Sequence, residues 1–241
     1  MTLALLCVAA VVAAVIQRVT GLAFILVLIG PAVVVYGPTQ GVTVAVLLAI
    51  IASAIALPSA WNQLDWRRIL WLLGAGLVAA PFGALLTRLL PEPALLLMIA
   101  GMAALALLAH RLGGVVAASL RGRRGALLAG GVAGFMHASS GLSGPALAAF
   151  AVGDRWDQRR FAASAQVILL GYGLVSVLLR GMPSIPVTDL AVLGVCTAAG
   201  IIGGALLTRV IPLSLARWAM LSCAWAGTVV VFIRGLLALA T

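Results

Sequence analysis

The chain has 241 residues, of which 64% are hydrophobic and only 8% are charged. A soluble globular protein is about 45–50% apolar and about 25% charged, and a chain of this length is too small to bury so many apolar side chains inside itself. The composition therefore excludes a soluble enzyme, a disordered tail and a secreted disulfide scaffold. It predicts an all-α integral membrane protein whose surface is largely solvated by lipid.

All 15 basic residues are arginines, against 5 acidic residues, which gives a formal net charge of +10. The arginines stand singly or in short clusters between apolar runs, a pattern typical of membrane loops rather than of a nucleic-acid-binding surface. We therefore predict no nucleic-acid partner. Cys7, Cys196 and Cys223 lie far apart within apolar runs, so their spacing predicts neither a metal site nor a disulfide.

The first residues have no positively charged region and no clean cleavage site, so we expect a retained membrane segment rather than a signal peptide. A membrane-spanning helix needs about 20 apolar residues. Six runs satisfy this requirement: 39–61, 67–90, 93–110, 158–180, 187–210 and 212–239.

Two further apolar stretches, 2–37 and 124–153, are interrupted by polar residues and glycine at 17–21 and 137–141. The pieces on either side of each interruption have about 12–17 residues, so several of them are too short for a hydrocarbon core of about 30 Å. We expect each stretch to form a broken helix pair that enters the membrane and returns to the side from which it came.

The two interruptions correspond to each other. Gly21-Leu22 matches Gly141-Leu142 at an offset of 120, and the segment 83–88 is identical to 204–209 at an offset of 121. Two matches at nearly the same offset indicate a duplication. The sequence thus predicts an N-terminal repeat (1–112), a linker (113–123) and a C-terminal repeat (124–241), each repeat a broken pair plus three transmembrane helices.

The arginines predict how the two repeats are oriented. If each broken stretch re-enters, the repeats are inverted, and eleven arginines share one side: Arg67, Arg68, Arg111, Arg121, Arg123, Arg124, Arg155, Arg159, Arg160, Arg209 and Arg217. Only Arg88, Arg180 and Arg234 then lie opposite. Parallel repeats would divide the arginines eight to six, so the positive-inside rule favours the inverted arrangement. The linker is then cytoplasmic and both termini are periplasmic.

Inverted repeats with paired, glycine-interrupted segments are typical of secondary transporters that bind substrate near the middle of the membrane. A helix that starts inside the membrane leaves its first N–H groups unpaired and carries about half a positive charge at that end. Such an end is suited to an anion. We expect helices starting near Gly21 and Gly141 to direct two such ends at a small anionic substrate.

The candidate substrate-binding residues lie at the two interruptions, with one polar residue from a later span: Gln17, Arg18, Thr20, Gly21, Leu22, His137, Ser139, Ser140, Gly141, Ser143 and Gln166. Structural roles compete for several of them. Thr20 and Ser140 can cap a helix as well as bind a ligand. Arg18 either binds the anion or extends to the membrane interface.

Two further polar positions are open to the same question. His137 is either a satisfied interior histidine or a titratable group at the site. Gln166 and Tyr172, inside an apolar span, either line the path or pair between helices. The chain has no lysine, no HExxH motif and no paired intramembrane aspartates, so we predict no enzyme, no catalytic residues, no metal and no cofactor.

The residues 16–24 (IQRVTGLAF) and 131–145 (GVAGFMHASSGLSGP) resemble the glycine-rich motifs that open each half of the TauE/SafE sulfite exporter-like transporters. In the first copy, Thr20-Gly21-Leu22-Ala23-Phe24 replaces the more common run of glycines. The resemblance extends over the whole chain. It implies a multi-pass secondary transporter of the bacterial inner membrane that moves sulfite, sulfonates or related organic acids.

The leading hypothesis is therefore a small-anion transporter that works by alternating access. A passive anion channel on the same fold and a non-transporting membrane scaffold are the alternatives. The sequence leaves open the exact substrate, the direction of transport, coupling to a proton or to the membrane potential, and whether the protein forms an oligomer.

Overall fold

The computed structural model describes residues 2–117, 120–207 and 212–240, and over these ranges the protein is entirely helical, with no strand. The elements are α1 (Thr2–Thr20), α2 (Phe24–Ala56), the 3-10 helix η1 (Leu57–Gln63), α3 (Trp66–Leu89), α4 (Glu92–Ala117), α5 (Gly122–Ser140), α6 (Gly144–Gly153), α7 (Gln158–Arg180), α8 (Val187–Leu207) and α9 (Leu213–Ala240). In the described part of the chain, six helices are long and apolar enough to cross a membrane: α1, α2, α3, α7, α8 and α9. The protein is an all-α integral membrane protein, as the composition predicts.

Helices α3, α7, α8 and α9 match four of the expected runs within the described residues. The expected run 39–61 is divided between α2 and η1, and the run 93–110 lies in α4, whose apolar part (Glu92–Leu108) is too short to be among the six. Helix α3 continues through Pro81, as expected for a membrane helix whose neighbours can satisfy the freed carbonyl. Helix α4 extends to Ala117, into the segment expected to be a linker. Residues 118–119 of that linker, and Arg209 of the arginine count, lie outside the described residues.

Both expected interruptions are present, and each occurs at a glycine. Helix α1 ends at Thr20 and is followed by Gly21 (φ +91°), whereas α5 ends at Ser140 and is followed by Gly141 (φ +78°). Glycine adopts this left-handed conformation without the steric penalty that a Cβ brings. Helices α2 and α6 then begin at Phe24 and Gly144.

The interruptions differ from expectation in one respect: α1 and α5 have 19 residues each, longer than the predicted pieces. Both helices continue through their polar residues because the hydroxyls bond carbonyls of the preceding turn, as Thr20 Oγ1 does to Ile16 O at 2.8 Å. The returning pieces are the short ones. Helix α6 has 10 residues, and α2 is interrupted at Gly37 (φ +78°) before Pro38.

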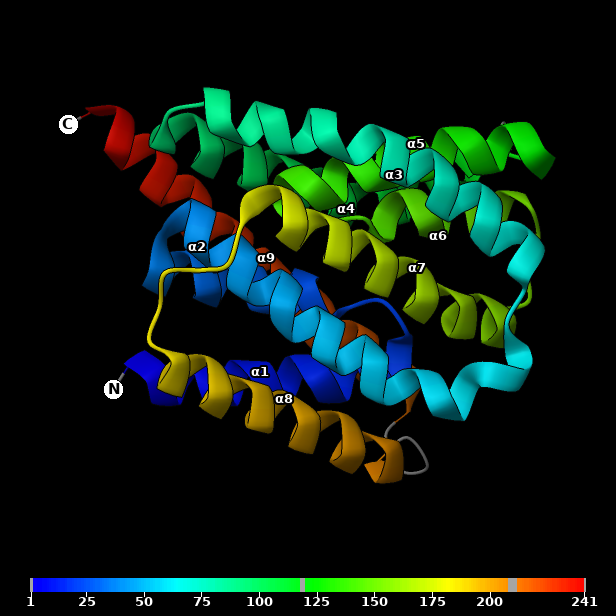
Figure 1. Ribbon diagram of the computed structural model, residues 1–241, viewed down its shortest axis with the longest axis horizontal. Helices are drawn as coiled ribbons and strands as arrows, with labels where there is room; N and C mark the ends of the chain where they lie inside the picture. The colour runs from blue at the N-terminus through cyan, green and yellow to red at the C-terminus, as the bar shows by residue number, and fades with distance from the viewer. Residues whose placement is uncertain (1, 118–119, 208–211, 241) are drawn as a thin grey trace.

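The two hairpins open toward opposite ends of the molecule. At one end, Asp154 after α6 bonds Arg68 at the start of α3 and the N–H of Gly122 at the start of α5. At the other end, Tyr36 in the first hairpin bonds Asp189 at the start of α8. Figure 1 shows both chain termini at this second end, on the left. We call the first the Asp154 end and the second the terminal end.

Glycines allow the helices to pack closely. Gly134 of α5 lies directly against the backbone of Gly76 in α3, so an added Cβ would overlap it. Gly200 of α8 plays the same part against α1, where an added Cβ would lie 2.6 Å from the Cβ of Ala14. Small residues allow such close helix contacts in membranes.

Replacing Gly134 with alanine should therefore destabilise the protein, whereas Gly131→Ala should not. An added methyl at Gly134 overlaps α3 backbone, and overpacking of this kind costs about 1–3 kcal/mol. Gly131 lies in the same helix, has nothing within 4 Å of an added Cβ, and gains helix propensity as alanine. Unfolding temperatures of the two purified variants in one detergent test this, and equal values would contradict the packing.

Candidate functional site

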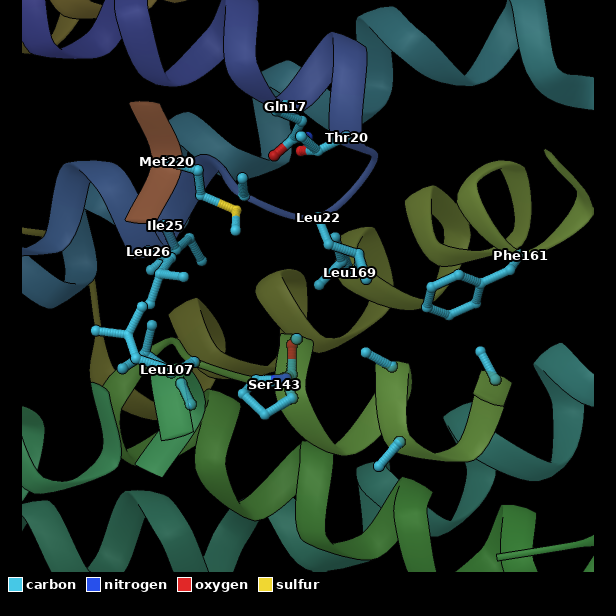
Figure 2. Close-up of a pocket in the computed structure, with 18 of the residues that line it drawn as sticks. Gln17, Thr20, Leu22, Ile25, Leu26, Leu107, Ser143, Phe161, Leu169 and Met220 are labelled. Carbon is cyan, nitrogen blue, oxygen red and sulfur yellow. The ribbon is translucent and has the colours of Figure 1, made fainter. Parts of the chain in front are cut away.

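A cavity of about 500 Å³ lies between the two helix interruptions. Leu22 and Ala23 line it from the first interruption, and Leu142, Ser143 and Gly144 line it from the second. The interruptions also lie close together, since a Cβ added at Gly144 would lie 3.8 Å from the carbonyl oxygen of Leu22. Figure 2 shows Gln17 and Thr20 on one side of the cavity and Ser143 on the opposite side. The starts of α2 and α6 therefore share one space.

The walls of the cavity are mostly apolar. Leu26, Leu107, Phe161, Leu169 and Met220 are among the lining residues, as Figure 2 shows. Val152, Arg155 and Gln158, at the Asp154 end, line the cavity and are all exposed, so we take this part of the lining as the mouth of the cavity. Among the described residues that line the cavity, Arg155 is the only one with a charged side chain.

Two buried amide side chains hold the first interruption in place. The Phe24 N–H at the start of α2 donates to Gln17 Oε1 at 3.2 Å, and Gln17 Nε2 donates to Gln166 Oε1 at 3.3 Å. Gln166, from α7, also donates to the carbonyl oxygen of Gly21 at 2.9 Å. Each amide therefore replaces a backbone partner that the interruption of the helix removes. The two candidates thus pair between helices.

His137 spans the second interruption in the position that matches Gln17. Its Nδ1 lies 3.0 Å from Ser143 Oγ, in the residue just before α6. Its Nε2 is buried and has no hydrogen-bond partner among the described residues. The ring of Tyr172 lies beside it, with centroids 5.8 Å apart, and the Tyr172 hydroxyl donates to the carbonyl of Leu72 at 2.6 Å. His137 therefore sets the direction of the Ser143 hydroxyl at the cavity wall.

Arg180 caps the C-terminal end of α5, a role that the sequence analysis does not predict. Its Nε donates to Ala138 O at 2.9 Å and its Nη2 to Ser139 O at 2.5 Å, so a guanidinium satisfies carbonyls of the last turn. The last four carbonyls of any helix lack partners inside it, and the C-terminal end carries partial negative charge. The signal was available: Arg180 ends an apolar span on the side with few arginines.

The structure divides the eleven predicted binding residues into two groups. The cavity is lined by Gln17, Thr20, Leu22, Gly141 and Ser143. The others are absent from its lining: Arg18, Gly21, His137, Ser139, Ser140 and Gln166.

Arg18, Ser139 and Ser140 are engaged elsewhere. Arg18 Nη2 donates to Ser59 Oγ at 2.9 Å, near the surface. The hydroxyls of Ser139 and Ser140 donate to Phe135 O and Met136 O of their own helix, each at 2.9 Å. A serine hydroxyl in a helix can donate to a carbonyl of the preceding turn, and a hydroxyl bonded in this way does not donate to a ligand. The two serines were expected at the site and are turned away from it for that reason.

Asp154 joins the start of α3 to the start of α5 near the mouth of the cavity. Burial alone would raise its pKa, but the N–H of Gly122 and the guanidinium of Arg68 hydrogen-bond its carboxylate, and together they lower the pKa of Asp154 below its ordinary value. Arg68 also bonds Asp65 Oδ2 at 2.8 Å. The described residues contain no group of three or more His, Cys, Asp or Glu side chains placed to hold a metal ion.

The comparisons with known proteins agree with this architecture. The family model described as Sulfite exporter TauE/SafE matches residues 6–231. The comparison with curated proteins gives no match, and neither does the comparison with solved structures.

Arg180→Leu should destabilise the protein much more than Arg88→Leu. Removing the Arg180 guanidinium leaves buried carbonyls of α5 without donors, and hydrogen bonds to charged groups contribute about 1.5–3 kcal/mol each. Arg88 makes its bond to Leu179 O at the exposed surface of the same end, so its loss should change stability by no more than about 0.5 kcal/mol. Thermal unfolding in detergent measures both, and similar shifts would refute a capping role for Arg180.

Proposed function

Because the chain belongs to the sulfite exporter TauE/SafE family, we propose that it is a secondary transporter that binds a small organic anion between its two helix interruptions. The observation that carries this proposal is the shared cavity, which is lined by the starts of both α2 and α6. The partial positive charge at the first turn of each helix favours a negatively charged ligand. No Asp or Glu occurs among the described lining residues to oppose it.

The size and walls of the cavity favour an anion with an apolar body. Its volume of about 500 Å³ falls in the range of about 300–1,000 Å³ typical of sites for organic ligands. One water occupies about 30 Å³, so a bare oxyanion would fill only a small part of the space. An alkyl sulfonate or carboxylate would place its charge at Ser143 and its chain against residues such as Leu26 and Met220.

The proposed topology follows from the charges at the two ends. The arginine-rich Asp154 end faces the cytoplasm by the positive-inside rule, and both termini face the periplasm of a bacterial inner membrane. The mouth of the cavity lies at the Asp154 end, so the structure represents an inward-open state in this scheme. The segments 1–112 and 124–241 act as the two inverted repeats. Their equivalent interruptions and oppositely directed hairpins support this division.

Alternating access then requires the terminal end to open while the Asp154 end closes. Contacts that now hold the terminal end together join the first hairpin to α8 and its preceding loop. Tyr36 donates to Asp189 at 3.3 Å, and Gln40 Oε1 accepts from the Ser184 N–H at 2.9 Å. Both bonds would break in the outward-open state. Because these bonds are exposed or partly buried, breaking them costs little free energy, since water can replace each partner.

Transport by the purified protein in liposomes tests the proposal. The anions are sulfite, methanesulfonate, 1-butanesulfonate and butyrate, each supplied outside vesicles with and without the same anion inside. We expect saturable exchange, with 1-butanesulfonate competing more strongly than sulfite. Current that neither saturates nor depends on internal anion would indicate a channel. No movement of any of the four above empty liposomes would refute transport of this substrate class.

Ser143→Ala should weaken anion binding, whereas Ser140→Ala should not. Both serines are buried and lie near the same interruption, but Ser143 lines the cavity and Ser140 bonds its own helix. A lost hydrogen bond to a charged ligand corresponds to about 1.5–3 kcal/mol, or roughly a ten- to hundredfold higher KM. The KM for the exchanged anion measures this, with unfolding temperature as the folding control. Equal KM values in the two variants would place the anion elsewhere.

A further inference from the structure

The turn that ends α6 contains a residue in an unusual conformation. Arg155 has φ +48°, and it is the only described residue other than glycine with a positive φ. Its N–H donates to Val152 O at 3.2 Å, and the N–H of Trp156 donates to Ala151 O at 2.8 Å. These two bonds define a Schellman motif, in which the left-handed position is usually glycine. An arginine there strains the backbone, which a glycine would not.

Such strain often marks a position where the side chain is needed. Arg155 lines the cavity at its mouth and is exposed. The turn places this one charged side chain at the mouth. A glycine would complete the same two hydrogen bonds, so the backbone motif by itself does not account for an arginine.

The neighbouring carboxylates do not neutralise Arg155. Asp154 Oδ2 accepts from Arg68 and its Oδ1 from the Gly122 N–H, at 2.6–2.8 Å. Asp157 Oδ1 accepts from the Arg160 N–H and caps the start of α7. No ion pair of Arg155 occurs in the part of the chain that the structure describes. The positive charge at the mouth is therefore left to act on a solute.

We infer that Arg155 is the residue that selects for negative charge at the mouth of the cavity: it attracts organic anions and repels cations before they reach the helix interruptions. The inference rests on the proposed function and assigns one part of it to one side chain. A charge at the opening of a cleft with apolar, low-dielectric walls raises the local concentration of oppositely charged solutes. The charge of Arg155 acts on access to the cavity, whereas Ser143 acts on the bound anion.

A reporter cysteine inside the cavity tests this without any need to know the substrate. The background replaces Cys7, Cys196 and Cys223 with alanine and introduces Ala148→Cys, at a lining position of α6. Two thiol reagents of similar size are compared, the anionic sulfonatoethyl and the cationic trimethylammonioethyl methanethiosulfonates. The measured quantity is the ratio of their modification rates in detergent at low ionic strength.

We expect Arg155→Gln to lower the anion-to-cation rate ratio about three- to tenfold, and Arg155→Lys to keep it. The difference should shrink in about 1 M salt, where the screening length falls to about 3 Å. Arg159→Gln is the matched control, because Arg159 is exposed at the same end but does not line the cavity. It should leave the ratio unchanged.

Arg155→Gly separates charge from folding. It removes the side chain and relieves the backbone strain, so the unfolding temperature should stay the same or rise while the rate ratio falls as in Arg155→Gln. An unchanged ratio in Arg155→Gln, an equal change in Arg159→Gln, or no reaction of the introduced reporter thiol with either reagent would overturn the inference. These outcomes are distinct from failure of the proposed function, which would appear as absence of anion exchange in liposomes by the unaltered protein.

Discussion

The need to satisfy backbone polar groups inside lipid controls the rest of this structure. Interrupting a helix there leaves N–H and C=O groups without their helical partners, in surroundings where lipid offers none. Long polar side chains supply the missing hydrogen bonds at each interruption. Gln17 accepts from the first N–H of α2, Gln166 donates to the Gly21 carbonyl, and Arg180 donates to the last carbonyls of α5.

Different side chains bond the backbone and the next helix start at the two interruptions. Gln17 and His137 occupy equivalent positions and both reach toward the start of the next helix. The C-terminal ends of the two interrupted helices differ more. The Gly21 carbonyl after α1 accepts from the amide of Gln166, whereas the last carbonyls of α5 accept from the guanidinium of Arg180. The two interruptions therefore differ in their electrostatics.

The positions of the two helix interruptions could be predicted because they depend on local features. Glycine at 21 and 141 marks both interruptions, and neighbouring residues such as Thr20 and Ser143 line the cavity as expected. Ser139 and Ser140 were misplaced because a serine in a helix has a competing carbonyl one turn back. Whether each hydroxyl points to the cavity or to the carbonyl one turn back is not decided by residue type and spacing.

The sequence by itself determined the membrane environment, the helix boundaries and the places where helices break, because hydropathy, arginine placement and glycine act over a few residues or one turn. Only the tertiary structure decided which polar groups meet. The Gln166 amide bonds the Gly21 carbonyl, 145 residues away in the sequence, and the Arg180 guanidinium bonds the Ala138 carbonyl, 42 residues away. Such meetings depend on how each helix is rotated and shifted against its neighbours. That relation is fixed by close packing at glycines such as Gly134 and Gly200, and no local pattern encodes it.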